Sequence, residues 1–125
     1  MSKTALILFA HGARDPEWAE PMRRLGTTLR EQAPGMRVEL AFLEFLKPEL
    51  GDCVESLVGE GFRRVVVLPM FIARGGHLKR DLPLLLEELQ QRHPQTRFEL
   101  AGAIGEAENV LQAMARHALD LLATG

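Results

Sequence analysis

Two histidines follow apolar runs of the chain, each with glycine beside it. His11 comes directly after the run Thr4–Ala10, and His77 comes a few residues after the run Val65–Met70. Glycine lets the backbone turn sharply and leaves a neighbouring imidazole open to a ligand. Neutral imidazole binds divalent transition metals and accepts protons near neutral pH. The pair therefore indicates a site that could hold a metal ion, take up protons, or do both.

A carboxylate could join these histidines. Glu44 follows a third apolar segment, Val38–Leu43, and would lie at the same rim if the three segments are neighbouring parallel strands. Two imidazoles and one carboxylate suit Co²⁺, Ni²⁺, Fe²⁺ or Zn²⁺. So sparse a donor set would release the ion more readily than a closed cage of four ligands. The alternative for Glu44 is a solvated carboxylate at a strand exit, and for each histidine a turn residue.

The apolar runs predict the strands that would position this site. The continuous runs Thr4–Ala10 and Val65–Met70 are typical of strands covered on both faces of a parallel sheet. The shorter, more alternating segments Val38–Leu43 and Phe98–Ala101 suit strands nearer an edge.

Segments with helical periodicity lie between and after these runs. The third helix is expected to begin near Leu82, because proline is favoured at a first helical position and Pro83 would occupy it. The apolar positions that mark the four helices are Trp18, Met22, Leu25 and Leu29; Cys53, Leu57 and Val58, ending at Gly59 or Gly61; Leu85, Leu86 and Leu89; and Val110, Leu111, Met114, Ala118, Leu121 and Leu122.

Four predicted strands alternate with four predicted helices, and this order predicts an α/β fold. A parallel sheet wound by right-handed crossovers is expected, with strand order 2-1-3-4 and helices on both faces. The first and third strands would then be central neighbours, and a crevice would open at their carboxyl ends, where open α/β sheets bind ligands. The length of 125 residues predicts a single domain, residues 1–125.

Composition narrows the classes of function. A net charge of −2 provides no broad field to attract nucleic acid or an anionic membrane. The longest apolar run, Val65–Ala73, is far shorter than the roughly 20 residues that span a bilayer. Cys53 is the only cysteine, which excludes an intrachain disulfide and favours a reducing compartment. The segment Met1–Thr4 lacks a signal-peptide layout, so a cytoplasmic protein is expected.

Three other residues are expected to be structural. Cys53 is interpreted as a small buried apolar residue. His93, before Pro94, is expected at a helix end, and His117 is expected at the edge of the core because of its spacing with Met114.

Three motifs in order resemble those of a known family. They are LILFAHGARD near the start, AFLEFLKPEL in the middle and VVVLPMFIARGGHLKRDLP after the third strand. With these motifs the chain resembles the short-form CbiX/SirB-type sirohydrochlorin chelatases, the class II chelatase family, over nearly its whole length. The resemblance implies a flavodoxin-like fold that corresponds to one half-unit of the longer members, and a homodimer.

The resemblance also implies an activity. The expected reaction is insertion of Co²⁺, with Fe²⁺ or Ni²⁺ as alternatives, into sirohydrochlorin without a nucleotide, for a cobalamin or siroheme-type route. The ion would be a substrate, and no permanently bound cofactor is expected. Insertion needs temporary metal ligands and acceptors for two pyrrole protons. By resemblance, His11 and His77 supply both and Glu44 is the acidic third member of the catalytic and metal-binding set.

Substrate carboxylates would require cations near the rim. Arg14 and Arg74 are the favoured candidates, since guanidinium pairs well with carboxylates, and Gly75 and Gly76 would complete the substrate-binding segment. Many relatives have serine where this chain has Ala13. Helix capping by that hydroxyl is therefore lost here, and Asp15, placed before a proline, is expected to supply the cap.

The same residues bear on three other functions. A histidine phosphatase usually needs arginine immediately before its histidine, where this chain has Ala10. A flavodoxin would need a hydroxyl-rich phosphate loop after the first strand. A non-catalytic metal or tetrapyrrole carrier would use the same residues as the enzyme and stays open as the alternative.

Overall fold

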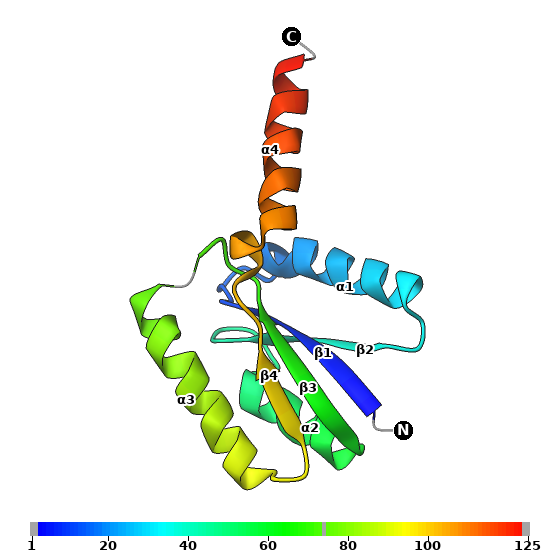
Figure 1. The fold of residues 1–125 in the computed structure, drawn as a ribbon, viewed down its shortest axis with the longest axis vertical. Coiled ribbons are helices and arrows are strands. Elements are labelled where there is room, and N and C mark those ends of the chain that lie inside the picture. The colour runs from blue at the N-terminus through cyan, green and yellow to red at the C-terminus, as the bar shows by residue number, and fades with distance from the viewer. Residues whose placement is uncertain (1–2, 74, 124–125) are drawn as a thin grey trace.

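The structure is a computed structural model that describes residues 3–73 and 75–123, apart from the side chain of His77. Four parallel strands form one sheet in the order β2-β1-β3-β4, which confirms the predicted topology (Figure 1). The strands are β1 (Lys3–Ala10), β2 (Arg37–Phe42), β3 (Phe62–Pro69) and β4 (Arg97–Leu100).

The helices follow the strands in the predicted alternation. They are α1 (Glu20–Gln32), α2 (Leu50–Gly59), α3 (Gly76–Arg92) and α4 (Glu108–Ala123), with the short 3₁₀ helices η1 (Pro16–Ala19) and η2 (Ile104–Glu106) before α1 and α4. The Asp15 side chain caps η1 by accepting a hydrogen bond from the Glu17 N–H at 3.0 Å, as expected from the sequence. No helix in the described part of the chain is long and apolar enough to cross a bilayer.

The predicted start of α3 is wrong. The helix begins at Gly76 rather than near Leu82, and Pro83 lies inside it. Proline there removes one backbone hydrogen bond and is locally unfavourable. However, Leu82, Leu86 and Leu89 are almost fully buried against the sheet, so tertiary packing outweighs the local preference. His77 therefore belongs to the first turn of a helix and not to a loop.

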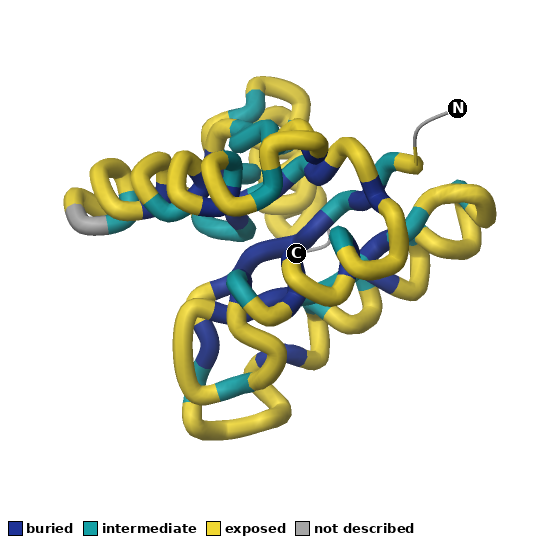
Figure 2. The backbone as a smooth tube through the Cα atoms, turned by 90° about the horizontal axis from the view of Figure 1, so that it is seen from below, coloured by how far each residue is buried: buried dark blue, intermediate teal, exposed yellow. Residues whose placement is uncertain are grey.

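One face of the sheet carries the main core. Helices α2 and α3 cover this face, and buried residues follow the strands while the outer helix surfaces are exposed (Figure 2). Phe9 and Cys53 both lie in this core, and the burial of Cys53 confirms its interpretation as a small apolar residue. Its other members include Ala5, Ile7, Val65 and Val67 from the central strands, Leu50, Val54 and Leu57 from α2, and Leu82, Leu86 and Leu89 from α3.

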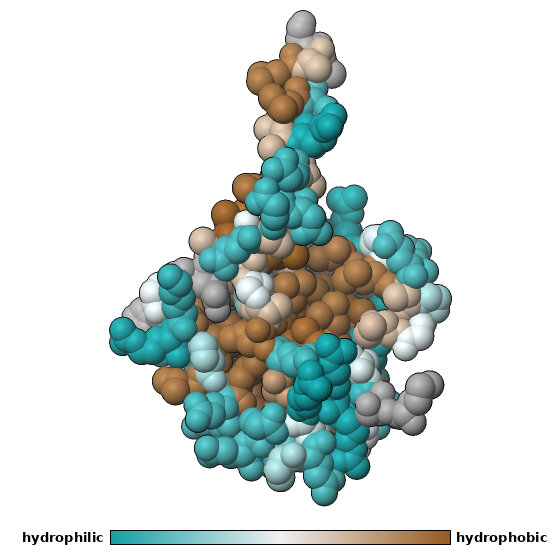
Figure 3. Space-filling model, viewed as in Figure 1, coloured by the Kyte–Doolittle hydropathy of each residue, from teal (hydrophilic) through white to brown (hydrophobic). Residues whose placement is uncertain are grey.

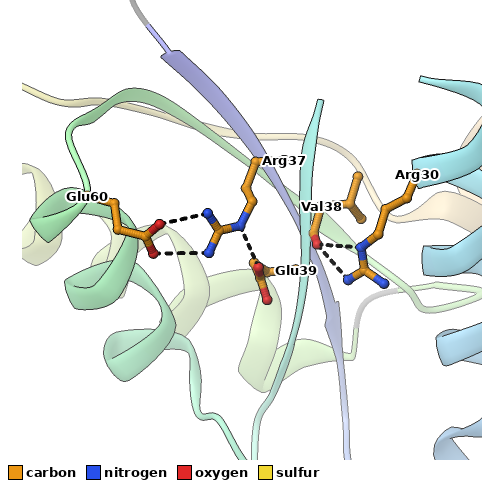
Figure 4. Close-up of polar contacts among 5 residues, drawn as sticks. All are labelled: Arg30, Arg37, Val38, Glu39 and Glu60. Atoms are coloured by element: carbon orange, nitrogen blue, oxygen red, sulfur yellow. Dashed lines mark hydrogen bonds and ion pairs between the residues drawn. The ribbon is translucent and has the colours of Figure 1, made fainter. Parts of the chain in front are cut away.

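The opposite face is covered only in part, by α1 over β2. Arg30 of α1 donates two hydrogen bonds to the carbonyl of Val38, at 3.2 and 2.7 Å, which fastens the helix to this edge strand (Figure 4). On the same strand Arg37 pairs with Glu60 through two hydrogen bonds and with Glu39 through one (Figure 4). These contacts anchor β2, whose end leads into the site.

The part of this second face over β3 is open, although Leu8 of the neighbouring β1 is buried there, and this corrects the prediction that β3 is buried on both faces. Val65 and Val67 are fully buried, whereas Val66 and Leu68, which point to the other face, are half-buried. Helix α4 leaves the domain and buries none of its residues (Figure 1). His117 on this helix is consequently exposed and is not a core-edge residue.

Candidate functional site

The backbone pairing of β1 and β2 continues beyond the ends of both strands. In register, Ala10 lies opposite Phe42. Past this pair, the N–H of Leu43 donates to the carbonyl of Ala10 at 2.9 Å, and the N–H of Glu44 donates to the carbonyl of His11 at 3.1 Å. The sheet register itself therefore places His11 beside Glu44.

Gly12 permits this close approach of the two chain segments. Its φ of 96° is a conformation that residues with a side chain rarely adopt. A Cβ at this position would also overlap the carbonyl oxygen of Glu44. Only glycine satisfies both requirements, so the residue after the histidine is determined by the neighbouring loop.

The side chains of His11 and Glu44 face each other. The imidazole Nε2 lies 3.4 Å from the carboxylate Oε1, and each side chain is 51% exposed. This separation is longer than an ordinary N–H···O hydrogen bond. Two ligands bonded to one tetrahedral ion at about 2.1 Å are themselves about 3.4 Å apart. The pair therefore has the spacing of two ligands to a shared ion, with solvent access to both.

The turn after Glu44 carries backbone strain. Phe45 has a φ of 68°, and the N–H of Leu46 donates to the carbonyl of Glu44 at 2.8 Å, which closes a γ-turn. Strained residues of this kind cluster at functional sites. The guanidinium of Arg14 lies over the Phe45 ring, 4.9 Å from its centroid, and has no carboxylate partner among the described residues. The turn thus holds an available cation close to Glu44.

A cleft opens at the carboxyl ends of the two central strands, where the sequence predicted one. Its volume is about 630 Å³, within the usual range of small-molecule sites. His11 lies in its wall, and most of the remaining described wall is apolar or glycine. The described lining consists of His11, Leu43, Phe71, Ala73, Gly75, Gly76, Leu78 and Asp81.

The other predicted site residues have different positions. Gly75 caps α3 and Gly76 begins it, and both line the cleft. The backbone of His77 lies in the first turn of α3, but its side chain, like all of Arg74, lies outside the described part of the structure. Within that part, no three metal-ligating side chains gather. The Arg14 guanidinium lies over the Phe45 ring, and Arg14 is not among the described residues that line the cleft.

Sequence reasoning missed Asp81 as a cleft residue. It follows His77 by four positions, one helical turn, so the signal was present in the sequence. It was hidden because the helix was expected to begin beyond both residues. Leu43 and Leu78 were missed for a simpler reason, since leucine at a strand or helix end carries no functional signature.

The topology and the cleft define a class of protein. A parallel α/β sheet with a ligand cleft at the point where the winding reverses is a flavodoxin-like binding domain. Residues 5–121 match the CbiX family, and the chain belongs to this family.

Individual relatives support the same family. The chain is 34% identical over 89 residues to a sirohydrochlorin cobaltochelatase of Methanocaldococcus jannaschii, covering 71% of this chain and 62% of that protein. It is 29% identical to the enzyme of that name from Saccharolobus islandicus, covering 89% and 90% of the two chains. It spans only 36% of the sirohydrochlorin cobaltochelatase of Priestia megaterium, at 28% identity.

Solved structures share the fold. A CbiX protein of Marinobacter aquaeolei VT8 superposes with a TM-score of 0.84 at 30% identity, covering 98% of this chain and 99% of that one. The sirohydrochlorin chelatase SirB of Bacillus subtilis subspecies spizizenii, in complex with cobalt, gives a TM-score of 0.78 at 24% identity. That superposition covers 94% of this chain and 50% of SirB.

Proposed function

We propose that this chain is a chelatase that inserts a divalent metal into sirohydrochlorin. Co²⁺ is the proposed metal substrate, with Fe²⁺ and Ni²⁺ as alternatives, in a cobalamin or siroheme-type route. The observation that carries the proposal is the facing pair of His11 and Glu44 beside an apolar cleft. The names of the relatives supply the tetrapyrrole, and the donor set suits any of the three ions.

The first step is capture of the ion. The Nε2 of His11 and the Oε1 of Glu44 displace water from the ion and hold it at the mouth of the cleft. His77, in the first turn of α3, is proposed as the third ligand. Because both described side chains are half-exposed and the donor set is sparse, the ion can enter from solvent and leave toward the ring.

The second step is exchange of the ion for two protons. A porphyrin-like ring releases two pyrrole protons as a divalent ion enters, so total charge is conserved. A neutral imidazole that has released the ion can accept a proton. For His11, the carboxylate of Glu44 at 3.4 Å would stabilise the resulting imidazolium. The same residues thus act first as ligands and then as bases.

The cleft wall would orient the ring. Leu43, Phe71 and Leu78 offer apolar contact to a flat macrocycle. Arg14, held on the Phe45 ring, is the proposed partner of a substrate carboxylate at the rim. Arg74, Gly75 and Gly76 complete the proposed substrate-binding set.

The proposal extends to the oligomeric state, the compartment and the cofactor requirement of the protein. Residues 1–125 are proposed to form one chelatase half-unit that works as a homodimer, because a flat ring needs two walls and one sheet supplies little more than one. The reaction is proposed to proceed in the cytoplasm, with no nucleotide and no permanently bound cofactor.

The test is a spectroscopic assay of metal insertion. Purified protein is mixed with sirohydrochlorin and Co²⁺, Fe²⁺ or Ni²⁺ in turn, and each rate is compared with the spontaneous reaction. We expect acceleration with at least one ion, and its loss by about a hundredfold or more in His11→Ala and in His77→Ala. Glu44→Gln should lose less, about tenfold, since the amide still offers an oxygen but no charge.

Matched variants separate chemistry from folding. Glu49→Gln changes an exposed carboxylate that contacts only Lys47, at 3.9 Å, among its described charged neighbours. His93→Gln keeps a hydrogen-bond donor for Glu55, whose Oε1 lies 3.0 Å from the His93 Nε2. This pair does not line the cleft. Both should retain full rates. Full activity in His11→Ala, or no acceleration by the unaltered protein with any of the three ions, would refute the proposed function.

A further inference from the structure

Two apolar surfaces of this chain lack a covering partner within the described structure. The first is the stripe of α4, on which Leu111, Met114 and Leu122 are exposed although they recur on one side of the helix. The second, the open sheet face, is formed by the partly exposed residues Leu6 of β1 and Val66 and Leu68 of β3. Figure 3 shows a broad apolar area over the sheet, with α4 standing clear of it. Apolar areas of this extent mark interaction surfaces.

The amino-acid pattern indicates that the open sheet face is covered in the working protein. The run Val65–Met70 is continuously apolar, as strands buried on both faces are. Within the single chain, however, only Val65 and Val67 are fully buried in the middle of this strand, while Val66 and Leu68 are not. The sequence of β3 is therefore typical of a strand covered on both faces, but no described segment of this chain covers its second face.

Helix α4 has the length and the apolar surface that are needed to cover this face of β3. Its 16 residues span about 24 Å, and the eight residues of β3 span about 26 Å. A helix laid along the strand would therefore cover the open sheet face from end to end. In register, Leu6 lies beside Val66, so the covered surface is apolar across two strands.

The base of α4 directs the helix away from its own sheet. Gly105 of η2 donates its N–H to the carbonyl of Phe71 at 2.9 Å. A side chain on Gly105 would overlap the backbone of Ile72, so the two segments are in close contact. Ala107, between η2 and α4, is extended, and α4 then projects outward (Figure 1). The occupant of the open face that fits this geometry is α4 of a second copy.

We infer that two copies of this chain exchange their last helices, so that α4 of each covers the open sheet face of the other. Exchange of an identical element makes the interface two-fold symmetric and buries both apolar surfaces at once. Because η2 is fastened to Phe71, which lines the cleft, docking of α4 on the partner also steadies the cleft wall.

The first test is the oligomeric state of two matched variants, measured by sedimentation. Met114→Glu places a charge in the apolar stripe, whereas Arg116→Glu places the same residue on the opposite side of α4. Met114→Glu should raise the dimer dissociation constant by at least about a hundredfold, because both copies lose a buried side chain. Arg116→Glu should remain a dimer. A monomeric unaltered protein, or equal behaviour of the two variants, would overturn the inference.

The second test identifies which surfaces meet. Met114→Cys and Val66→Cys proteins are mixed and left to exchange subunits in a glutathione redox buffer, so that thiols that meet while the dimer assembles pair as a disulfide. Burial raises the pKa of the Cys53 thiol to about 12, so the native cysteine stays unreactive. Exchange predicts a covalent dimer in the mixture and little in either variant alone. Cross-linking of Met114→Cys to itself would show that α4 pairs with α4. In a variant that carries both cysteines, cross-linking only within one chain would show that α4 folds back onto its own sheet. Either result refutes exchange.

The inference rests on the proposed homodimer but not on the chelatase reaction. A monomer would refute the dimer and the exchange together, whereas a dimer with a different cross-linking pattern would refute the exchange alone. Neither readout depends on activity, so failure of the proposed reaction is recognised separately.

Discussion

Gly12→Ala tests how the sheet register builds the site. The substitution forces alanine to a φ of 96°, at a cost of about 1–2 kcal/mol. The new Cβ also overlaps the Glu44 carbonyl, so the Glu44 backbone must move and its hydrogen bond to His11 breaks, at a further cost of about 1 kcal/mol. The free energy of unfolding should therefore fall by about 2–3 kcal/mol.

The same displacement should impair the reaction. A shift of about 1 Å between reacting groups can cost about a hundredfold in rate. Because the new methyl pushes Glu44 away from His11, insertion activity should fall by this order even in the folded fraction. Urea unfolding at fixed protein concentration measures the stability, and the spectroscopic assay measures the rate.

Gly61→Ala is the matched control. Gly61 has a nearly identical φ of 93°, but a Cβ there would meet no atom within 4 Å. It should lose only the conformational cost of about 1–2 kcal/mol and keep full activity. If Gly12→Ala is no less stable than Gly61→Ala and equally active, the account of the His11–Glu44 register is refuted.

Three further predictions concern the scaffold. Thr96→Val removes the buried hydrogen bond of 3.1 Å from the Thr96 hydroxyl to the Phe62 carbonyl and should lower the free energy of unfolding by about 1–2 kcal/mol; an unchanged urea midpoint would contradict this. The hydrogen bonds from Arg37 lower the pKa of Glu60, so the pair stabilises the fold above the ordinary glutamate pKa and stops doing so as pH falls through the folded value. Glu60→Gln should consequently destabilise more at pH 7 than at pH 3, by chemical denaturation, and an equal effect would show that the pair is not linked to pH. Because burial raises the pKa of Cys53 to about 12, the native protein should react with maleimide at pH 8 far more slowly than the unfolded chain, and equal labelling rates would contradict the assigned burial.

The sheet and half of the candidate site could be predicted from local patterns. The apolar runs determine which segments become strands, and short connections with right-handed crossovers leave few possible strand orders. Once β1 and β2 are parallel neighbours, the residues that follow them must meet at one edge. For that reason the sequence alone predicts that His11 and Glu44 lie together, as they do in the structure.

The start of α3 could not be predicted by the same reasoning. Pro83 is a strong local signal for a helix start, and only the burial of Leu82, Leu86 and Leu89 reveals that packing prevails. That error moved His77 from a helix to a loop and concealed the cleft position of Asp81. Local propensity is decisive only where tertiary contacts do not oppose it.

The surface against which α4 packs could not be predicted from the sequence for a different reason. Its apolar stripe indicates that the helix packs against something, but periodicity does not say which surface. The half-buried state of Val66 and Leu68 became visible only in three dimensions. The apolar stripe of α4 and the incomplete burial of β3 together identify the partner surface.

The most direct test of the central claim is the number of metal insertions per protein chain. Sirohydrochlorin and Co²⁺ are supplied in large excess over the protein, and the metallated product is followed by its absorption after subtraction of the spontaneous reaction. A chelatase with the proposed His11–Glu44 site produces many product molecules per chain at a steady rate. Product that stops at one equivalent per chain would identify a stoichiometric carrier and contradict the account.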